Sequence, residues 1–87
     1  MEQNLDMAMY WYQKAADQEE NPWSRTVANN NIGSFYDNGI GVGKDTSKAI
    51  EYYRKALKCA EENPEVEQAN PELIVKIKRN LETLNAL

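Results

Sequence analysis

Apolar residues recur at helical spacing along most of this chain, separated by short polar or glycine-rich breaks. The most regular stretch is 28–57, where two periodic runs flank the glycine-rich segment 39–43. Their apolar positions are Ala28, Ile32, Phe35 and Tyr36 in the first run and Ala49, Ile50, Tyr52, Tyr53, Ala56 and Leu57 in the second. Steps of three and four residues are typical of amphipathic helices. The pattern therefore predicts two helices that pack as an antiparallel hairpin.

Proline, asparagine, aspartate and glycine residues indicate where the helices begin and end. Pro22 suits the first position of a helix, and Asn38 and Gly39 suit the left-handed residue that closes one. Asp45 offers a side-chain oxygen to the free amides at the start of the next helix. Two further periodic stretches flank this pair, so we expect about four helices, with a polar link before the last. The expected ranges are 5–19, 22–37, 46–62 and 71–87.

The first expected helix repeats the third at a shift of 41 residues. The matching pairs are Ala8 with Ala49, Met9 with Ile50, Trp11 with Tyr52, Tyr12 with Tyr53, Lys14 with Lys55, and Ala15 with Ala56. The sequence Glu-Glu-Asn-Pro also recurs, at 19–22 and 61–64. A period near 40 residues is typical of a helical solenoid, in which each hairpin packs on the next.

Gly33 lies inside the second expected helix, where glycine costs about 1 kcal/mol relative to alanine. A glycine in such a position usually has a packing reason. We expect it to allow close approach of the following helix, near Ala49.

The central hairpin also carries small, aromatic and glycine residues in a characteristic order. They are Ala28, Asn31-Ile32-Gly33, Tyr36, Gly39, Gly41-Val42, Asp45, Lys48-Ala49 and Tyr53-Arg54-Lys55-Ala56. This order resembles the Sel-one-like repeat (SLR), a relative of the tetratricopeptide repeat. Ile32 stands where that family has Leu, Leu57 replaces its second closing Ala, and the usual closing Gly is missing.

The resemblance implies an all-α fold, with antiparallel helical hairpins stacked as a short right-handed α-solenoid. The single domain 1–87 would contain the second helix of a partial repeat at 5–19, a complete repeat at 22–62 and a C-terminal capping helix at 71–87. An apolar stripe marks that last helix: Leu73, Ile77, Leu81 and Leu84. Glu82 stands where Gly33 would recur and leaves no room for a close partner, so the stack is expected to end there. The alternative is a dimerising helix.

Length and charge narrow the possible classes of protein. Eighty-seven residues with 41% apolar content suit one small helical domain. The net charge of −4, with acids interleaved among the lysines, argues against nucleic acid, which requires a basic face. The N-terminal residues lack the basic and apolar segments of a signal peptide or membrane span. We therefore expect a cytoplasmic protein, or a piece of a larger one, that is a monomer or weak homodimer.

Few residues of the chain are candidates for catalysis or for binding a cofactor. The chain has no histidine, and its only cysteine, Cys59, has no evident base beside it, so acyl-transfer triads and ordinary zinc sites lack their parts. The segment 39–44 resembles a phosphate loop, but Asn38 and Asp45 stand where that motif needs Gly and Ser or Thr. The sequence predicts no enzyme, cofactor or metal site.

The SLR resemblance implies a protein-protein interaction scaffold or adaptor. In that family the first helix of each repeat lines a concave face that binds a peptide or partner domain. Four residues of helix 22–37 point away from its packing face and are the predicted partner-binding residues: Val27, Asn30, Ser34 and Asp37. Alternatively, they are simply solvated. A second hypothesis is a purely structural terminal repeat, or a homodimer formed through Trp11, Trp23 and the last helix.

Overall fold

The computed structural model describes residues 3–17 and 21–86, and in these ranges it contains helices and no strands. The helices are α1 (Gln3–Ala16), α2 (Pro22–Asn38), α3 (Thr46–Glu62), α4 (Pro64–Ala69) and α5 (Pro71–Thr83). The predicted all-α class is confirmed. Right-handed solenoid stacking stays a prediction, as do the bounds of the repeats.

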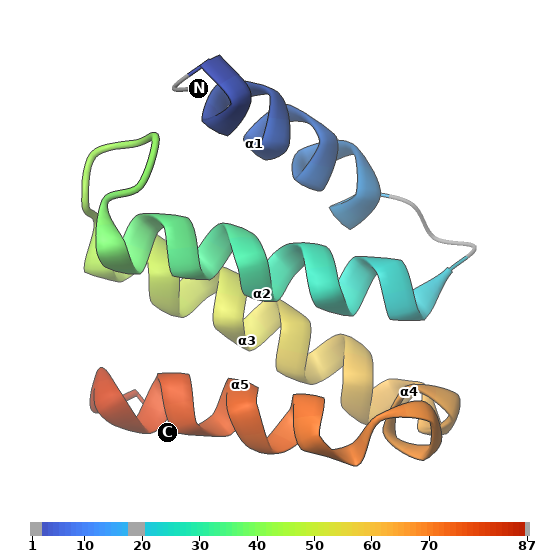
Figure 1. Cartoon of the computed structure of the whole chain (residues 1–87). Helices are drawn as coiled ribbons and strands as arrows, with labels where there is room; N and C mark the ends of the chain where they lie inside the picture. The colour runs from blue at the N-terminus through green and yellow to red at the C-terminus, as the bar shows by residue number, and fades with distance from the viewer. Residues whose placement is uncertain (1–2, 18–20, 87) are drawn as a thin grey trace.

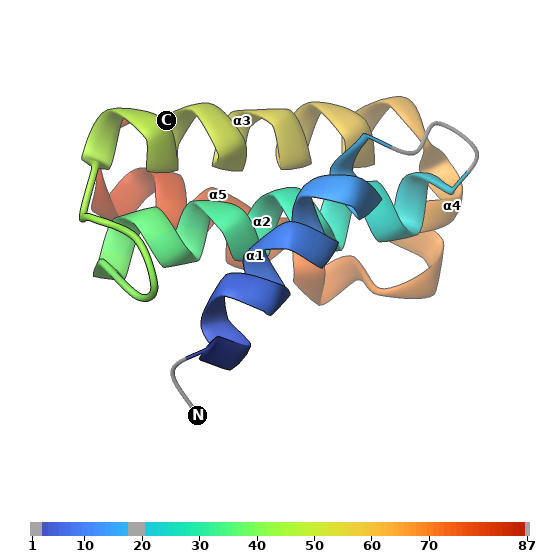
Figure 2. The same ribbon diagram turned by 90° about the horizontal axis from the view of Figure 1, so that it is seen from above.

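The four longer helices follow one another in chain order across the molecule (Figure 1). Helices α2 and α3 lie side by side and antiparallel, which confirms the central hairpin. Helix α1 packs on one side of α2 and crosses it obliquely, as Figure 2 shows from above. Helix α5 packs on α3 at the other side of the hairpin, and the short α4 forms the turn between them.

Local capping chemistry explains why α2 and α3 begin and end where the sequence predicted. Asn21 Oδ1 accepts a hydrogen bond from the Ser24 amide at 3.1 Å, and Asp45 Oδ1 accepts one from the Lys48 amide at 3.1 Å. Gly39 has φ +66° and closes α2 in the left-handed conformation that glycine adopts without strain. These caps satisfy backbone groups that a helix end leaves without partners.

Two predicted bounds were wrong. Helix α1 covers Gln3–Ala16 instead of 5–19, and Glu19 lies outside the described residues. Helix α5 ends at Thr83 instead of continuing to residue 87. It stops because Asn85 takes a left-handed conformation, φ 58°, and the Ala86 amide folds back to the Leu81 carbonyl. Such a turn closes the helix by satisfying one of its last carbonyls.

Helix α4 falls within the segment expected to be a polar link. Its one buried residue is Val66, which is 1% exposed, while the glutamates on either side point to solvent. A six-residue helix with a single apolar residue cannot show a helical period. It forms because Val66 packs into the core, a contact that the local pattern does not reveal.

The core lies between α3 and α5 and continues to α2. Its buried members are Ala49, Tyr53, Ala56, Ala60, Val66, Leu73, Ile77 and Leu81. The apolar stripe predicted for the last helix therefore covers the hairpin. Helix α3 approaches Gly33 closely, as predicted, and the nearest side chain is Tyr53: a Cβ at position 33 would lie 2.7 Å from Cδ1 of its ring. Gly33 makes room for Tyr53, one turn beyond Ala49.

Candidate functional site

The four predicted partner-binding residues lie along α2, and none of them is fully exposed. Val27, Ser34 and Asp37 are half-buried, and Asn30 is only 6% exposed. Val27 packs against the core, and the Ser34 carbonyl accepts a hydrogen bond from Asn38 Nδ2 at 2.9 Å. Their binding role stays a prediction, but the surface that they form is less open than expected.

Asn30 is the residue that differs most from expectation, because it contacts α5. Asn80 Nδ2 donates a hydrogen bond to Asn30 Oδ1 at 3.2 Å. This bond joins the middle of α2 to α5 over 50 positions of sequence. The side chain expected to point into a groove is thus a buried contact within the chain. Spacing along one helix does not show which neighbour will cover it.

Asp37 accepts a hydrogen bond from Tyr53 across the hairpin. The distance from the Tyr53 hydroxyl to Asp37 Oδ2 is 3.3 Å. Burial raises the pKa of Tyr53 to about 12, and the negative charge of Asp37 acts in the same direction. The hydroxyl therefore stays protonated at neutral pH and holds the carboxylate in place.

Beside Val27 the surface has a small apolar notch between α1 and α2. Its volume is about 190 Å³, and its lining residues are Tyr12, Ala15, Trp23, Ser24, Val27 and Ala28. Trp23 is 38% exposed and lies four residues before Val27, on the same side of α2. Trp23 was predicted only as part of a homodimer contact. Trp23 is a large aromatic residue one helical turn before Val27, and this spacing was the signal that could have added it to the predicted site.

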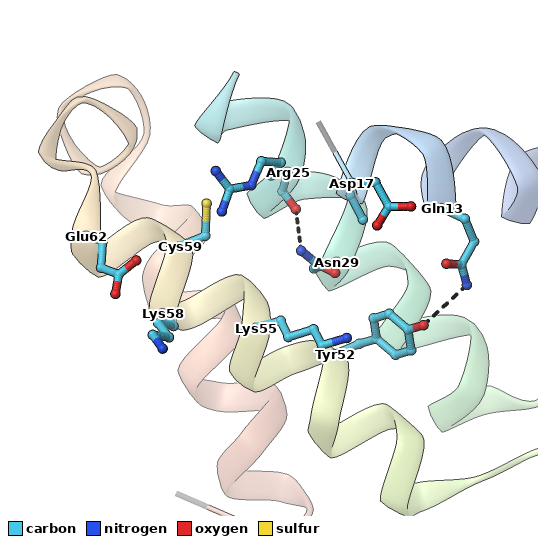
Figure 3. Close-up of a pocket in the computed structure, with 10 residues that line it drawn as sticks. Gln13, Asp17, Arg25, Asn29, Tyr52, Lys55, Lys58, Cys59 and Glu62 are labelled. Carbon is cyan, nitrogen blue, oxygen red and sulfur yellow. Dashed lines mark hydrogen bonds between the residues drawn. The ribbon is translucent and has the colours of Figure 1, made fainter. Parts of the chain in front are cut away.

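A larger and more polar cleft of about 320 Å³ lies between α1, α2 and α3 (Figure 3). Its lining residues are Gln13, Ala16, Asp17, Arg25, Asn29, Tyr52, Lys55, Lys58, Cys59 and Glu62. Gln13 Nε2 donates a hydrogen bond to the Tyr52 hydroxyl at 3.4 Å, and Asn29 Nδ2 donates one to the Arg25 carbonyl at 3.0 Å. Both positive and negative side chains line this cleft, and none of the predicted partner-binding residues does.

Reactive groups are few in the part of the chain that the structure describes. Cys59 is buried, and its thiol donates a hydrogen bond to the Pro22 carbonyl at 3.4 Å. No group of three or more histidine, cysteine, aspartate or glutamate side chains is placed to hold a metal ion among the described residues. Within the same ranges, every helix is too short or too polar to span a membrane.

Comparison with known proteins identifies the family. The family model of the Sel1 repeat matches residues 1–20 and 26–60, which include α1 and most of the α2–α3 hairpin. No curated protein and no solved structure matches the chain significantly. Sel1 repeats are scaffold repeats without catalytic activity of their own, and they generally mediate protein-protein interaction. The match covers well over half of the residues, so the chain belongs to the Sel1 repeat family.

Proposed function

We propose that this chain is an interaction scaffold that binds a peptide or partner domain through one face of α2. This α2 face comprises the predicted residues Val27, Asn30, Ser34 and Asp37, together with Trp23. It corresponds to the concave face expected from stacked repeats. A cytoplasmic location and a monomeric or weakly dimeric state belong to the same proposal.

The observation that carries the proposal is the apolar notch next to Val27. Tyr12 and Trp23 form its walls, and the notch is open to solvent. A partner that inserts an apolar side chain removes aromatic surface from water at both walls, which contributes about 25 cal/mol per Å². Partly exposed tryptophan and tyrosine side chains are the residues most enriched among binding hot spots.

The polar end of the α2 face would orient the partner. The Ser34 hydroxyl oxygen accepts a hydrogen bond from Asn38, which fixes the side chain at this end of the face. Asp37 accepts one hydrogen bond from Tyr53 and has further lone pairs for partner donors. Asn30 acts from beneath, because its bond to Asn80 holds α2 against α5. The face therefore suits a partner that inserts an apolar side chain into the notch and places polar backbone groups near Ser34.

Selection of binders from a random peptide library displayed on phage tests the proposal. The selected peptides should bind the Trp23→Ala and Val27→Ser variants at least about tenfold more weakly, because these changes remove the notch. The control is Val75→Ala, which alters an exposed apolar side chain on α5 that does not line the notch. Circular dichroism checks that each variant is folded. Peptides that bind all variants equally would assign their binding to another surface and refute the proposal.

A further inference from the structure

We propose that the polar cleft between α1, α2 and α3 is a second binding site, separate from the α2 face, for an extended acidic peptide segment. One acidic side chain of the segment binds Arg25, and a backbone N–H beside it donates a hydrogen bond to Asn29 Oδ1. The cleft lies on the other side of α2 from the α2 face, because Arg25 precedes Val27 by two residues, a turn of about 200° around the helix. Three packed helices of this chain form its walls, so the cleft does not depend on a further repeat.

Arg25 is the residue that favours an anionic ligand. Its side chain is half-buried and lines the cleft, and it forms no ion pair with any residue that the structure describes. Lys55, by contrast, already has a carboxylate partner, since its Nζ lies 3.4 Å from Glu51 Oε2. A half-buried guanidinium has lost part of its hydration, and a carboxylate matches its planar set of donors with two parallel hydrogen bonds. The ligand group that best suits Arg25 is therefore a carboxylate.

Asn29 supplies a hydrogen-bond acceptor deep in the same cleft. It is 6% exposed, and its Nδ2 donates to the Arg25 carbonyl at 3.0 Å. No described residue donates to its Oδ1, and within the described ranges every fully buried side-chain oxygen has a partner. The Asn29 oxygen therefore opens into the cleft that the residue lines. Buried helix positions usually carry apolar residues, so a buried amide that faces a cleft is suited to accept a ligand N–H.

The other charges favour a peptide that runs through the cleft. Asp17 and Glu62 are exposed and lie on opposite sides of Arg25 in Figure 3. A segment with its acidic side chain on Arg25 brings neighbouring basic side chains towards both carboxylates, which is the complementary arrangement of charge. A peptide that ended at Arg25 would leave one of these carboxylates unmatched. The cleft volume of about 320 Å³ is at the small end for ligand sites, which suits a few peptide residues.

A short peptide with one acidic residue is the probe for this site. The acetylated and amidated peptide Gly-Lys-Gly-Glu-Gly-Lys-Gly is titrated into the ¹⁵N-labelled chain, and the Arg25 Nε–H and Asn29 side-chain amide resonances are followed. We expect both to shift, while the indole N–H resonance of Trp23 on the α2 face stays in place. Replacing the peptide's glutamate by glutamine should weaken binding at least about tenfold, because the group that meets Arg25 loses its charge.

Variants of the protein locate the contact. Arg25→Gln should weaken peptide binding at least about tenfold. The matched control is Arg79→Gln, the same change at an exposed position of α5 outside the cleft, which should leave binding unchanged. Arg25→Lys keeps the charge without the planar fork and should give an intermediate affinity. Circular dichroism checks that each variant is folded.

The results that would overturn the proposal are specific to this cleft. They are absence of peptide binding, equal binding of the glutamate and glutamine peptides, and equal binding by Arg25→Gln and the natural chain. Equal binding of a peptide with no acidic residue but a free C-terminus would also overturn it, since the carboxylate would then come from a chain end. A shift of Trp23 alone would assign the peptide to the α2 face, which would overturn this proposal and leave the proposed function standing.

Discussion

The aromatic ring of Tyr53 occupies the space that a side chain at position 33 would need. A Cβ on Gly33 would lie 2.7 Å from Cδ1 and 2.8 Å from Cε1 of the ring. Tyr53 is itself 1% exposed and packs in the core, so the ring has little room to move. The glycine and the tyrosine together determine how closely α2 and α3 approach.

Gly33→Ala and Gly33→Leu should both lower the free energy of unfolding. Overpacking against Tyr53 costs about 1 to 3 kcal/mol, which exceeds the roughly 1 kcal/mol gained from better helix propensity, and leucine should cost more than alanine. Urea unfolding followed by circular dichroism measures the change. The control adds Tyr53→Leu to each variant, which should reduce the cost by removing the ring. An unchanged or raised unfolding midpoint would contradict the contact.

The pKa of Tyr53 predicts a loss of stability at high pH. Its value is raised from 10.0 to about 12 in the folded chain. Because the folded state holds the proton more tightly than the unfolded state, the contribution is complete below about pH 10 and is lost as pH rises through about 12. At about 1.4 kcal/mol for each pKa unit, the effect is at most about 3 kcal/mol. Urea midpoints between pH 8 and 12 should fall more steeply for the natural chain than for Tyr53→Phe. Parallel curves would show that Tyr53 does not contribute.

Asn80→Ala should destabilise the fold although Asn80 itself is only half-buried. Its removal leaves the Asn30 oxygen, in a residue that is 6% exposed, without the hydrogen bond from α5. Leaving a buried polar group without a partner costs about 1 to 3 kcal/mol. Thermal unfolding compares this variant with Asn30→Ala and with the double variant. If the two single changes were additive, the two side chains would not be coupled.

Truncation after Asn70 should harm the whole domain, because it removes the cover of α3. Leu73, Ile77 and Leu81 are 9%, 0% and 1% exposed, and each buried side chain contributes about 1.5 to 3 kcal/mol. Their sum is comparable with the net stability of a small domain. We expect aggregation, or a loss of helical circular dichroism larger than the share of the deleted residues.

A point variant tests whether the loss of stability comes from the missing apolar contacts of α5 and not simply from the shorter chain. Ile77→Ala should cost about 2 to 5 kcal/mol, whereas Val75→Ala, at an exposed position on the same helix, should change stability by less than about 0.5 kcal/mol. A truncated chain that stays monomeric with the melting temperature of the parent would show that α5 is an appendage.

The α2–α3 hairpin could be predicted because its signals are local. Asp45 and Gly39 act on backbone groups within a few residues, and helical spacing shows one face of each helix directly. Gly33 was also recognised as a packing contact from a local signal, because glycine inside a helix lowers helix stability unless close packing requires it. The sequence predicted the approaching helix but did not single out Tyr53 as the nearest side chain, because spacing along one helix does not give the offset between two packed helices.

Tertiary packing decided the rest of the candidate site. Asn30 is buried and accepts a hydrogen bond from Asn80 of α5, and Asp37 is held because Tyr53 reaches it from α3. The apolar notch at Trp23 exists only where α1 crosses α2. These relationships join residues far apart in the sequence, whereas a periodic pattern reports only on residues within one helix. The sequence by itself therefore determined the four longer helices and the family. The packing of α1 and α5 on the hairpin decided that α4 forms and which side chains remain open to a partner.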